Sequence, residues 1–220
     1  GIENAGVAIN PGNGGIAVDG FSRTSVPNIY AIGDVTHRLN LTPVAIREGH
    51  AFADTVFGNK PTPVDHTNVP TAVFSEPKVG TVGLTEAQAR ASHSHVDIYK
   101  ATFRPLKATL SGSHTRVLMK LVVDGTSDRV LGCHIVGEGA TELIHIGQAV
   151  LNLGGTLDYF VENAFNYPTL AEAYKIDPDT QQASWPLIDI TKLGDQAVKV
   201  TEAVPPPTTR KVKPDRKSVV

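Results

Sequence analysis

Residues 24–35 read Thr-Ser-Val-Pro-Asn-Ile-Tyr-Ala-Ile-Gly-Asp-Val, and residues 41–45 read Leu-Thr-Pro-Val-Ala. The apolar run at residues 28–32 has the composition of a β-strand, and it ends abruptly at Gly33 and Asp34. A strand that ends in this way places the Asp34 carboxylate at the carboxyl edge of a sheet, where α/β proteins bind ligands. Glycine allows a ligand to approach the backbone, and a carboxylate accepts hydrogen bonds from ribityl or ribose hydroxyls. An ordinary turn would explain Asp34 equally well.

A helix is predicted to follow this turn. Thr42 is a suitable N-cap, Pro43 fits the first helical turn, and Gly58 follows the last apolar position. The free N–H groups and the dipole of a helix N-terminus favour negative charge, such as that of a reduced flavin around N1 and O2. The start of this helix is therefore either an anion-binding site or an ordinary capped terminus.

Residues 65–180 have a different organisation, because several strands follow one another and the helices are grouped around them. The predicted strands are Val69–Ser75, Val79–Gly83, Val96–Phe103, Arg116–Val123 and Val130–Val136. Four helices are predicted. The first begins at Thr85, in a capping box with Gln88, and the second carries an apolar stripe of Leu143, Ile146, Val150 and Leu151. The last two cover residues 157–162 and 170–175. This order favours an α+β fold over alternating βαβ units.

The composition fits one to two domains. The 220 residues carry 20 basic and 22 acidic side chains, so a net charge of −2 gives no electrostatic reason for nucleic acid or an anionic membrane as a partner. Cys133 is the only cysteine, which excludes a disulfide framework and a two-cysteine redox centre within these residues, and no metal site is predicted. Without a membrane-length apolar run or a leader, we expect a cytoplasmic protein with no membrane contact.

The first 136 residues resemble the class I flavoprotein pyridine nucleotide–disulfide oxidoreductases, and within that family the glutathione reductases. The stretches that carry the resemblance are Leu41–Ala45, Ala72–Ser75 and Gly80–Glu86. The resemblance implies that Gly33 and Asp34 contact FAD, Asp34 at the ribityl chain. It also implies that the backbone of Leu41 and Thr42 lies at the pyrimidine edge of the flavin, and that NADPH binds outside these residues.

The resemblance divides the chain into three segments. Residues 1–62 are expected to be the C-terminal end of an FAD-binding α/β domain, residues 63–178 an antiparallel-sheet interface domain that forms a homodimer, and residues 179–220 an irregular, disordered tail. The sequence contains neither G-x-G-x-x-G nor C-x-x-x-x-C, and in the family these motifs precede the matching region. We therefore expect the C-terminal part of such an enzyme, which by itself binds FAD weakly or not at all and has no turnover.

A second candidate site lies at residues 166–172, Asn-Tyr-Pro-Thr-Leu-Ala-Glu. In the family, the corresponding His-Pro-Thr-x-x-Glu motif enters the active site of the partner subunit, where the His exchanges a proton with a thiol and the Glu orients the His. Glu172 keeps its position here, but Tyr167 replaces the His, and a phenol with a pKa of about 10 is poorly matched to acid–base catalysis near pH 7. As alternatives, Glu172 could only close a capping box with Thr169, and Tyr167 could be an interfacial aromatic.

Residues 138–176 resemble instead the soluble pyridine nucleotide transhydrogenases, chiefly at Glu142–Ala149 and Asp158–Val161. Those flavoproteins pass hydride between two nicotinamide cofactors and need no substrate disulfide. Three functions therefore stay open. The first is reduction of a small-molecule disulfide such as glutathione disulfide, with electrons passing from NADPH through FAD and a cysteine pair. The others are transhydrogenation and a non-catalytic dimerisation module.

Overall fold

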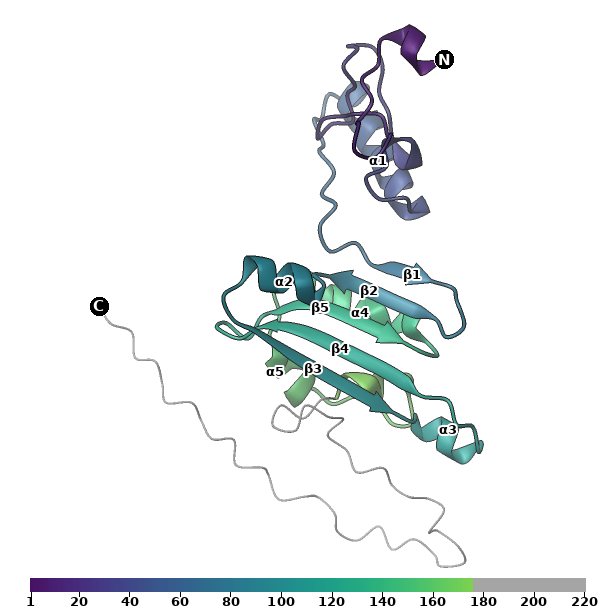
Figure 1. The fold of residues 1–220 in the computed structure, drawn as a ribbon, viewed down its shortest axis with the longest axis vertical. Helices are drawn as coiled ribbons and strands as arrows, with labels where there is room; N and C mark the ends of the chain where they lie inside the picture. Colours follow the sequence, from purple (N-terminus) through teal and green to yellow (C-terminus); the bar gives the residue numbers. More distant parts are fainter. Residues whose placement is uncertain (176–220) are drawn as a thin grey trace, which may run out of the picture. The chain divides into compact units, whose positions relative to one another are not determined.

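The computed structural model describes residues 1–175 (Figure 1). The predicted tail, residues 179–220, lies outside the described residues. These residues form two segments, 1–68 and 69–175.

Segment 69–175 is built on one antiparallel sheet of five strands in the order β1-β2-β5-β4-β3. The strands are β1 (Thr71–Val73), β2 (Val79–Gly83), β3 (Val96–Phe103), β4 (Val117–Asp124) and β5 (Val130–Val136). All five predicted strands are confirmed, although β1 is shorter than expected. Side chains alternate between the two faces of β4, so Met119, Leu121 and Val123 share one face and Val122 lies on the other.

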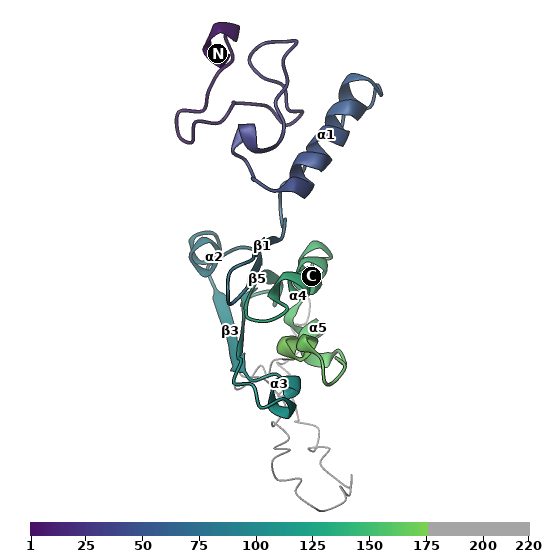
Figure 2. The same cartoon turned by 90° about the vertical axis from the view of Figure 1, so that its right-hand side faces the viewer.

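Helices cover both faces of this sheet. α4 (Ala140–Asn152) packs on β2 and β5, and together with α5 (Leu157–Glu162) it closes the larger core, which includes Met119 and Leu121. α2 (Glu86–Ser92) lies on the opposite face, where Ala89 packs in a small cluster with Val122 (Figure 2). The α+β fold is confirmed, and so is the Thr85 capping box at the start of α2.

Two short helices complete this segment. α3 (Leu106–Leu110) has no counterpart in the prediction. The last predicted helix is present as a 3₁₀-helix, η3 (Leu170–Tyr174). Tyr174 is fully buried and its ring stacks on Phe160 of α5, with ring centroids 5.0 Å apart, so η3 is held against the core.

Segment 1–68 contains η1 (Ile2–Ala5), η2 (Gly33–Thr36) and one long helix, α1 (Thr42–Val56). The predicted strand at residues 28–32 is wrong: only Tyr30 pairs there, through an isolated antiparallel bridge to Arg23. A strand needs neighbouring strands to satisfy its backbone, and segment 1–68 supplies none. Thr42 as N-cap is also wrong, because Leu41 occupies that position in extended conformation and Thr42 is the first helical residue.

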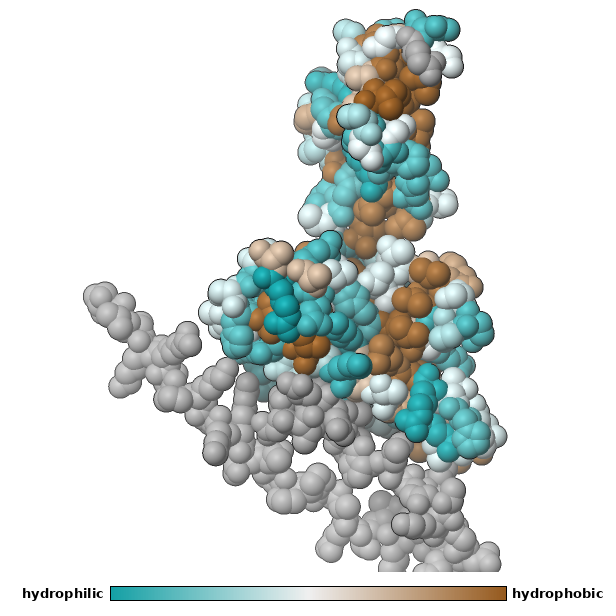
Figure 3. All heavy atoms as spheres, viewed as in Figure 1, coloured by the Kyte–Doolittle hydropathy of each residue, from teal (hydrophilic) through white to brown (hydrophobic). Residues whose placement is uncertain are grey.

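Several large apolar side chains of segment 1–68 are exposed, and Figure 3 shows hydrophobic residues at its surface. They are Ile2, Ile9, Ile32, Val35, Ile46, Val56 and Phe57. Several large apolar side chains left exposed are typical of a surface that packs against more protein. Among residues 1–175, no helix is long and apolar enough to cross a membrane.

Candidate functional site

The turn that carries Asp34 is packed tightly against α1. Gly33 has a φ of +69°, which disfavours residues with a side chain, and it is buried. A Cβ at this position would lie 3.1 Å from the Cβ of Ala45, in the first turn of α1. Asp34 is exposed, and its carboxylate has no hydrogen-bond partner among the described residues. The structure therefore brings the predicted Gly33-Asp34 turn and the start of α1 together.

The start of α1 is open to a ligand. Leu41, at the N-cap, makes no side-chain cap bond, and Thr42 is exposed. Pro43 in the first turn has no N–H, which leaves the Thr42 amide as the first free donor of the helix. An uncapped terminus of this kind favours an anionic or electron-rich group.

These residues fit the flavin that the sequence resemblance implies. The lack of a side chain at Gly33 lets the turn lie against the start of α1, the Asp34 carboxylate is free to accept hydrogen bonds from ribityl hydroxyls, and the Thr42 amide is free to donate one. Whether Gly33, Asp34, Leu41 and Thr42 bind FAD stays a prediction. When bound, a flavin supplies two-electron chemistry by accepting hydride from a nicotinamide.

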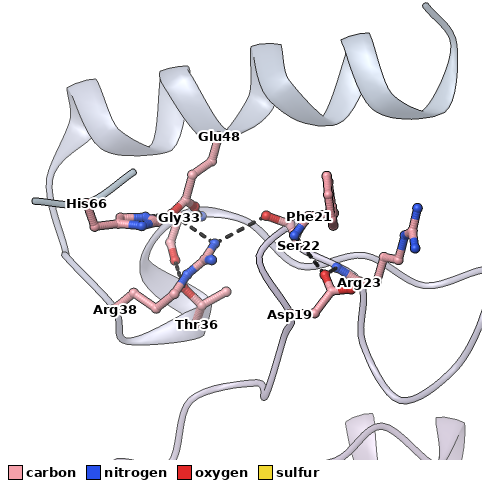
Figure 4. Close-up of polar contacts among 9 residues, drawn as sticks. All are labelled: Asp19, Phe21, Ser22, Arg23, Gly33, Thr36, Arg38, Glu48 and His66. Carbon is pink, nitrogen blue, oxygen red and sulfur yellow. Dashed lines mark hydrogen bonds and ion pairs between the residues drawn. The ribbon is translucent and has the colours of Figure 1, made fainter. Parts of the chain in front are cut away.

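Glu48, which holds this turn, was not among the residues predicted from the sequence. Its side chain is buried on the same face of α1 as Val44 and Ala51. Glu48 Oε2 accepts a hydrogen bond of 2.6 Å from the Gly33 amide, while Oε1 lies 2.9 Å from Arg38 Nη2 and 2.6 Å from His66 Nε2 (Figure 4). The available signal was a carboxylate at a helical spacing that otherwise carries apolar residues.

Glu48 is held in its charged form by these partners. Burial alone raises the pKa of a carboxyl group, but the Gly33 and His66 hydrogen bonds and the Arg38 charge outweigh it and lower the pKa of Glu48. Arg38 is itself fixed, because it donates to Thr36 Oγ1 at 3.3 Å and to Ser22 Oγ at 3.2 Å. The turn thus sits on a fully partnered ionic cluster.

The second predicted site has a different character. The Glu172 side chain is almost buried, and its Oε1 accepts a hydrogen bond of 3.1 Å from the Leu106 amide at the start of α3. The capping-box alternative is wrong, because the Thr169 hydroxyl accepts no hydrogen bond from the backbone of η3 and donates instead to the Asn166 carbonyl. Glu172 therefore links η3 to α3, and it stays available for a further role.

Glu172 and Tyr167 both hold their protons more strongly than usual. Burial raises the pKa of Glu172, only partly offset by the Leu106 hydrogen bond. Burial and then the nearby charge of Glu172 raise the pKa of Tyr167 to about 12, although the ring is partly exposed. The structure thus places the two residues close enough to interact, and Tyr167 is a hydrogen-bond donor at neutral pH.

The remaining candidates carry no reactive site. Cys133 is fully buried, and burial raises the pKa of its thiol to about 12, so it is unreactive. Within the described part of the chain, no three His, Cys, Asp or Glu side chains could together hold a metal ion.

Comparison with known proteins identifies the family. The family model described as pyridine nucleotide-disulphide oxidoreductase, dimerisation domain, matches residues 69–178, and the one described as pyridine nucleotide-disulphide oxidoreductase matches residues 1–49. A glutathione reductase of Burkholderia cepacia is 54% identical over 174 residues, which are 79% of this chain and 38% of that protein. A trypanothione reductase of Trypanosoma congolense is 44% identical over 172 residues, covering 78% of this chain and 35% of that protein.

Solved structures agree with these matches. The HOCl-induced flavoprotein disulfide reductase RclA from Escherichia coli, solved as a Cu(II) complex, superposes with a TM-score of 0.67 at 30% sequence identity. The match covers 78% of this chain and 39% of that one, so this chain spans well under half the length of its relatives. The resemblance seen in the sequence is confirmed, and the chain belongs to the pyridine nucleotide–disulphide oxidoreductases.

Proposed function

We propose that this chain is the C-terminal part of an FAD-dependent, NADPH-using reductase of small-molecule disulfides, most like glutathione reductase, which works as a homodimer in the cytoplasm. The observation that carries the proposal is the Gly33-Asp34 turn packed on the open start of α1, in a chain 54% identical to a glutathione reductase. Residues 1–62 would complete the FAD-binding domain, and residues 63–178 would form the dimer interface.

In this proposal the first segment binds the cofactor. Asp34 accepts hydrogen bonds from the ribityl chain, Gly33 lets the chain approach, and the backbone of Leu41 and Thr42 faces the flavin pyrimidine edge. Overall, NADPH and a proton would reduce one disulfide, such as glutathione disulfide, to two thiols. The cysteine pair and the nucleotide site that this reaction needs would lie in a part of the protein outside these 220 residues.

Tyr167 and Glu172 would enter the active site of the partner subunit. With its pKa raised to about 12, Tyr167 can donate a hydrogen bond to a thiolate or a disulfide sulfur, but it cannot take up the thiol proton near neutral pH. Disulfide turnover with Tyr167 should therefore be slower than with an imidazole at the same place, because a His with a pKa near 6.5 exchanges protons at physiological pH.

The protein expressed from its complete reading frame tests this. We expect it to carry one FAD per subunit and to oxidise NADPH when glutathione disulfide is added. Tyr167→His should raise the disulfide-dependent rate, whereas Tyr167→Phe, the matched control, should leave it unchanged or lower it. An unchanged or lower rate in Tyr167→His would contradict the role given to this position, and a complete protein without flavin would contradict the proposed function.

One observation favours a second function, transhydrogenation from NADPH to NAD. That reaction transfers hydride between nicotinamides and requires no proton exchange with a thiol, so the replacement of the family His by Tyr167 would carry no penalty. Reduction of an oxidised NAD analogue by NADPH, measured without any disulfide, separates the two functions. If the protein binds no flavin but sediments as a dimer, the dimerisation-module alternative is the one supported.

A further inference from the structure

A buried carboxylate next to the proposed flavin site has no role in the function above. Glu48 is only 1% exposed, and burying a charge of this kind is unfavourable unless it is fully paired. Both of its oxygens are paired: Oε2 by the Gly33 amide, and Oε1 by Arg38 and His66 (Figure 4). One carboxylate thereby joins α1, the Gly33 turn and two further points of the chain.

The hydrogen bonds converge on the backbone of Gly33. Its N–H donates to Glu48 at 2.6 Å, and its carbonyl accepts a hydrogen bond of 2.8 Å from the Thr36 hydroxyl. The two peptide planes that flank Gly33 are therefore both fixed. Because glycine has no side chain, its backbone torsions are less restricted than those of other residues, so without these bonds the turn would sample several conformations.

The cluster also controls where Asp34 lies. Asp34 follows Gly33 directly, and its own carboxylate is exposed without a partner among the described residues. Its position is thus set by the backbone of Gly33 and by η2, and Arg38 reinforces η2 by its hydrogen bond to Thr36. If Glu48 served only the stability of the fold, it would not need to accept a hydrogen bond from the N–H of Gly33, the residue directly before Asp34.

We propose that Glu48 is a positioning residue of the flavin site: held by Arg38 and His66, it fixes the Gly33 turn so that the Asp34 carboxylate is preorganised for the ribityl hydroxyls of FAD. The proposal rests on the proposed function. Its chemical logic is that of preorganisation, because a turn fixed before binding loses less conformational freedom when the cofactor arrives. Glu48 itself makes no contact with the cofactor in this scheme.

The test compares variants of the protein expressed from its complete reading frame. Glu48→Gln keeps the size of the side chain but removes its charge. Asp54→Asn removes a carboxylate from the same helix, where Asp54 only forms an exposed ion pair with Lys60. Ala51→Gly weakens α1 at a buried position without touching the cluster. The apoprotein of each is titrated with FAD, and the dissociation constant is read from the quenching of flavin fluorescence.

We expect Glu48→Gln to bind FAD at least about tenfold more weakly, since the Gly33 amide is left with a neutral acceptor and Arg38 loses the charge with which it pairs. The visible circular dichroism of the bound flavin should change as well. Both controls should stay within about twofold of the wild type, although Ala51→Gly melts at a lower temperature. Thr36→Val removes the second bond to Gly33, and with it the Arg38 bond to the same hydroxyl, while leaving every charge in place, and we expect about threefold weaker binding or more. This variant gives the answer if Glu48→Gln does not fold.

The outcomes separate this inference from the proposed function. A flavin-bound wild type together with a Glu48→Gln variant, or failing that a Thr36→Val variant, of unchanged FAD affinity overturns the inference alone. Equal weakening in Ala51→Gly and Glu48→Gln also overturns it, because the effect would then follow from the stability of α1. A wild-type protein that binds no FAD overturns the proposed function, and the inference with it.

Discussion

Removal of one buried hydroxyl, in Tyr174→Phe, tests how the element that carries Glu172 is attached. Tyr174 lies in η3, and its hydroxyl donates to the Leu143 carbonyl and accepts a hydrogen bond of 3.1 Å from the Gly147 amide. Leu143 and Gly147 are one turn apart on α4, so the hydroxyl lies between a carbonyl and an N–H that would otherwise form a hydrogen bond of the helix. The Cys133 sulfur lies 3.8 Å from the same oxygen.

The expected loss of stability follows from these contacts. Each intramolecular hydrogen bond contributes about 1 kcal/mol net, so two lost bonds amount to about 2 kcal/mol. α4 can recover part of this by closing a direct bond from the Gly147 amide to the Leu143 carbonyl, which sets a lower limit of about 1 kcal/mol. The ring itself is retained, so its stacking on Phe160 continues and no large cavity forms.

Urea denaturation of the chain, followed by far-ultraviolet circular dichroism, measures this loss. The matched control is Tyr159→Phe, at a residue that is 45% exposed, and we expect its effect to stay within about 0.5 kcal/mol. Native-state hydrogen exchange adds a local readout: in Tyr174→Phe the amides of Gly147 and of Leu106, which donates to Glu172, should both exchange faster. Wild-type stability with unchanged exchange at Gly147 would refute the account.

Two further predictions concern the same segment. Gly80→Ala places a Cβ against the Ala140 carbonyl and about 3.0 Å from the Ile144 Cβ, so it should lower the free energy of unfolding by about 1–3 kcal/mol in urea denaturation. Gly20→Ala, the control, has open space around the new Cβ and should cost far less. Equal effects of the two substitutions would contradict the close packing of α4 on β2. Burial raises the pKa of Glu172, so its contribution to stability is fully present below the ordinary pKa of 4.5 and is lost as the pH rises through the raised value. Between pH 5 and pH 8, the stability of Glu172→Gln relative to the wild type should therefore rise with pH. A difference in stability that does not depend on pH would show that Glu172 does not titrate in this interval.

Local sequence signals were enough to predict much of segment 69–175. The bounds of β3, β5 and α5 agree with the prediction, because alternation in the strands and the Gly154-Gly155 stop before α5 are both read within a few residues. The Gly33-Asp34 turn was also readable, since a glycine after an apolar run indicates a positive φ. These features depend only on neighbours in the chain.

The features that were missed or wrong depend on distant partners. α3 has five residues, too few for a periodic pattern, and the amide of its first residue is satisfied by Glu172, 66 residues away. The expected strand at residues 28–32 needed strands that segment 1–68 does not contain. Glu48 was missed because a buried carboxylate makes sense only once Arg38 and His66 are seen beside it.

The two buried glutamates, Glu48 and Glu172, have pKa values shifted in opposite directions. Glu48 has three partners that stabilise its charge, so its pKa is lowered and it acts as a fixed anion beneath the Gly33 turn. Glu172 has a single amide partner and no cation beside it among the described residues, so its pKa is raised and it competes with Tyr167 for negative charge. A phenol beside such a carboxyl group resists deprotonation, which makes hydrogen-bond donation the chemistry available at this place. An imidazole there would instead become protonated more readily beside an ionised Glu172, because the carboxylate stabilises its positive charge. The comparison of Tyr167 with His at this position therefore tests whether the Glu172 carboxyl still supports proton exchange, or whether this chain has kept the glutamate only as the link between η3 and α3.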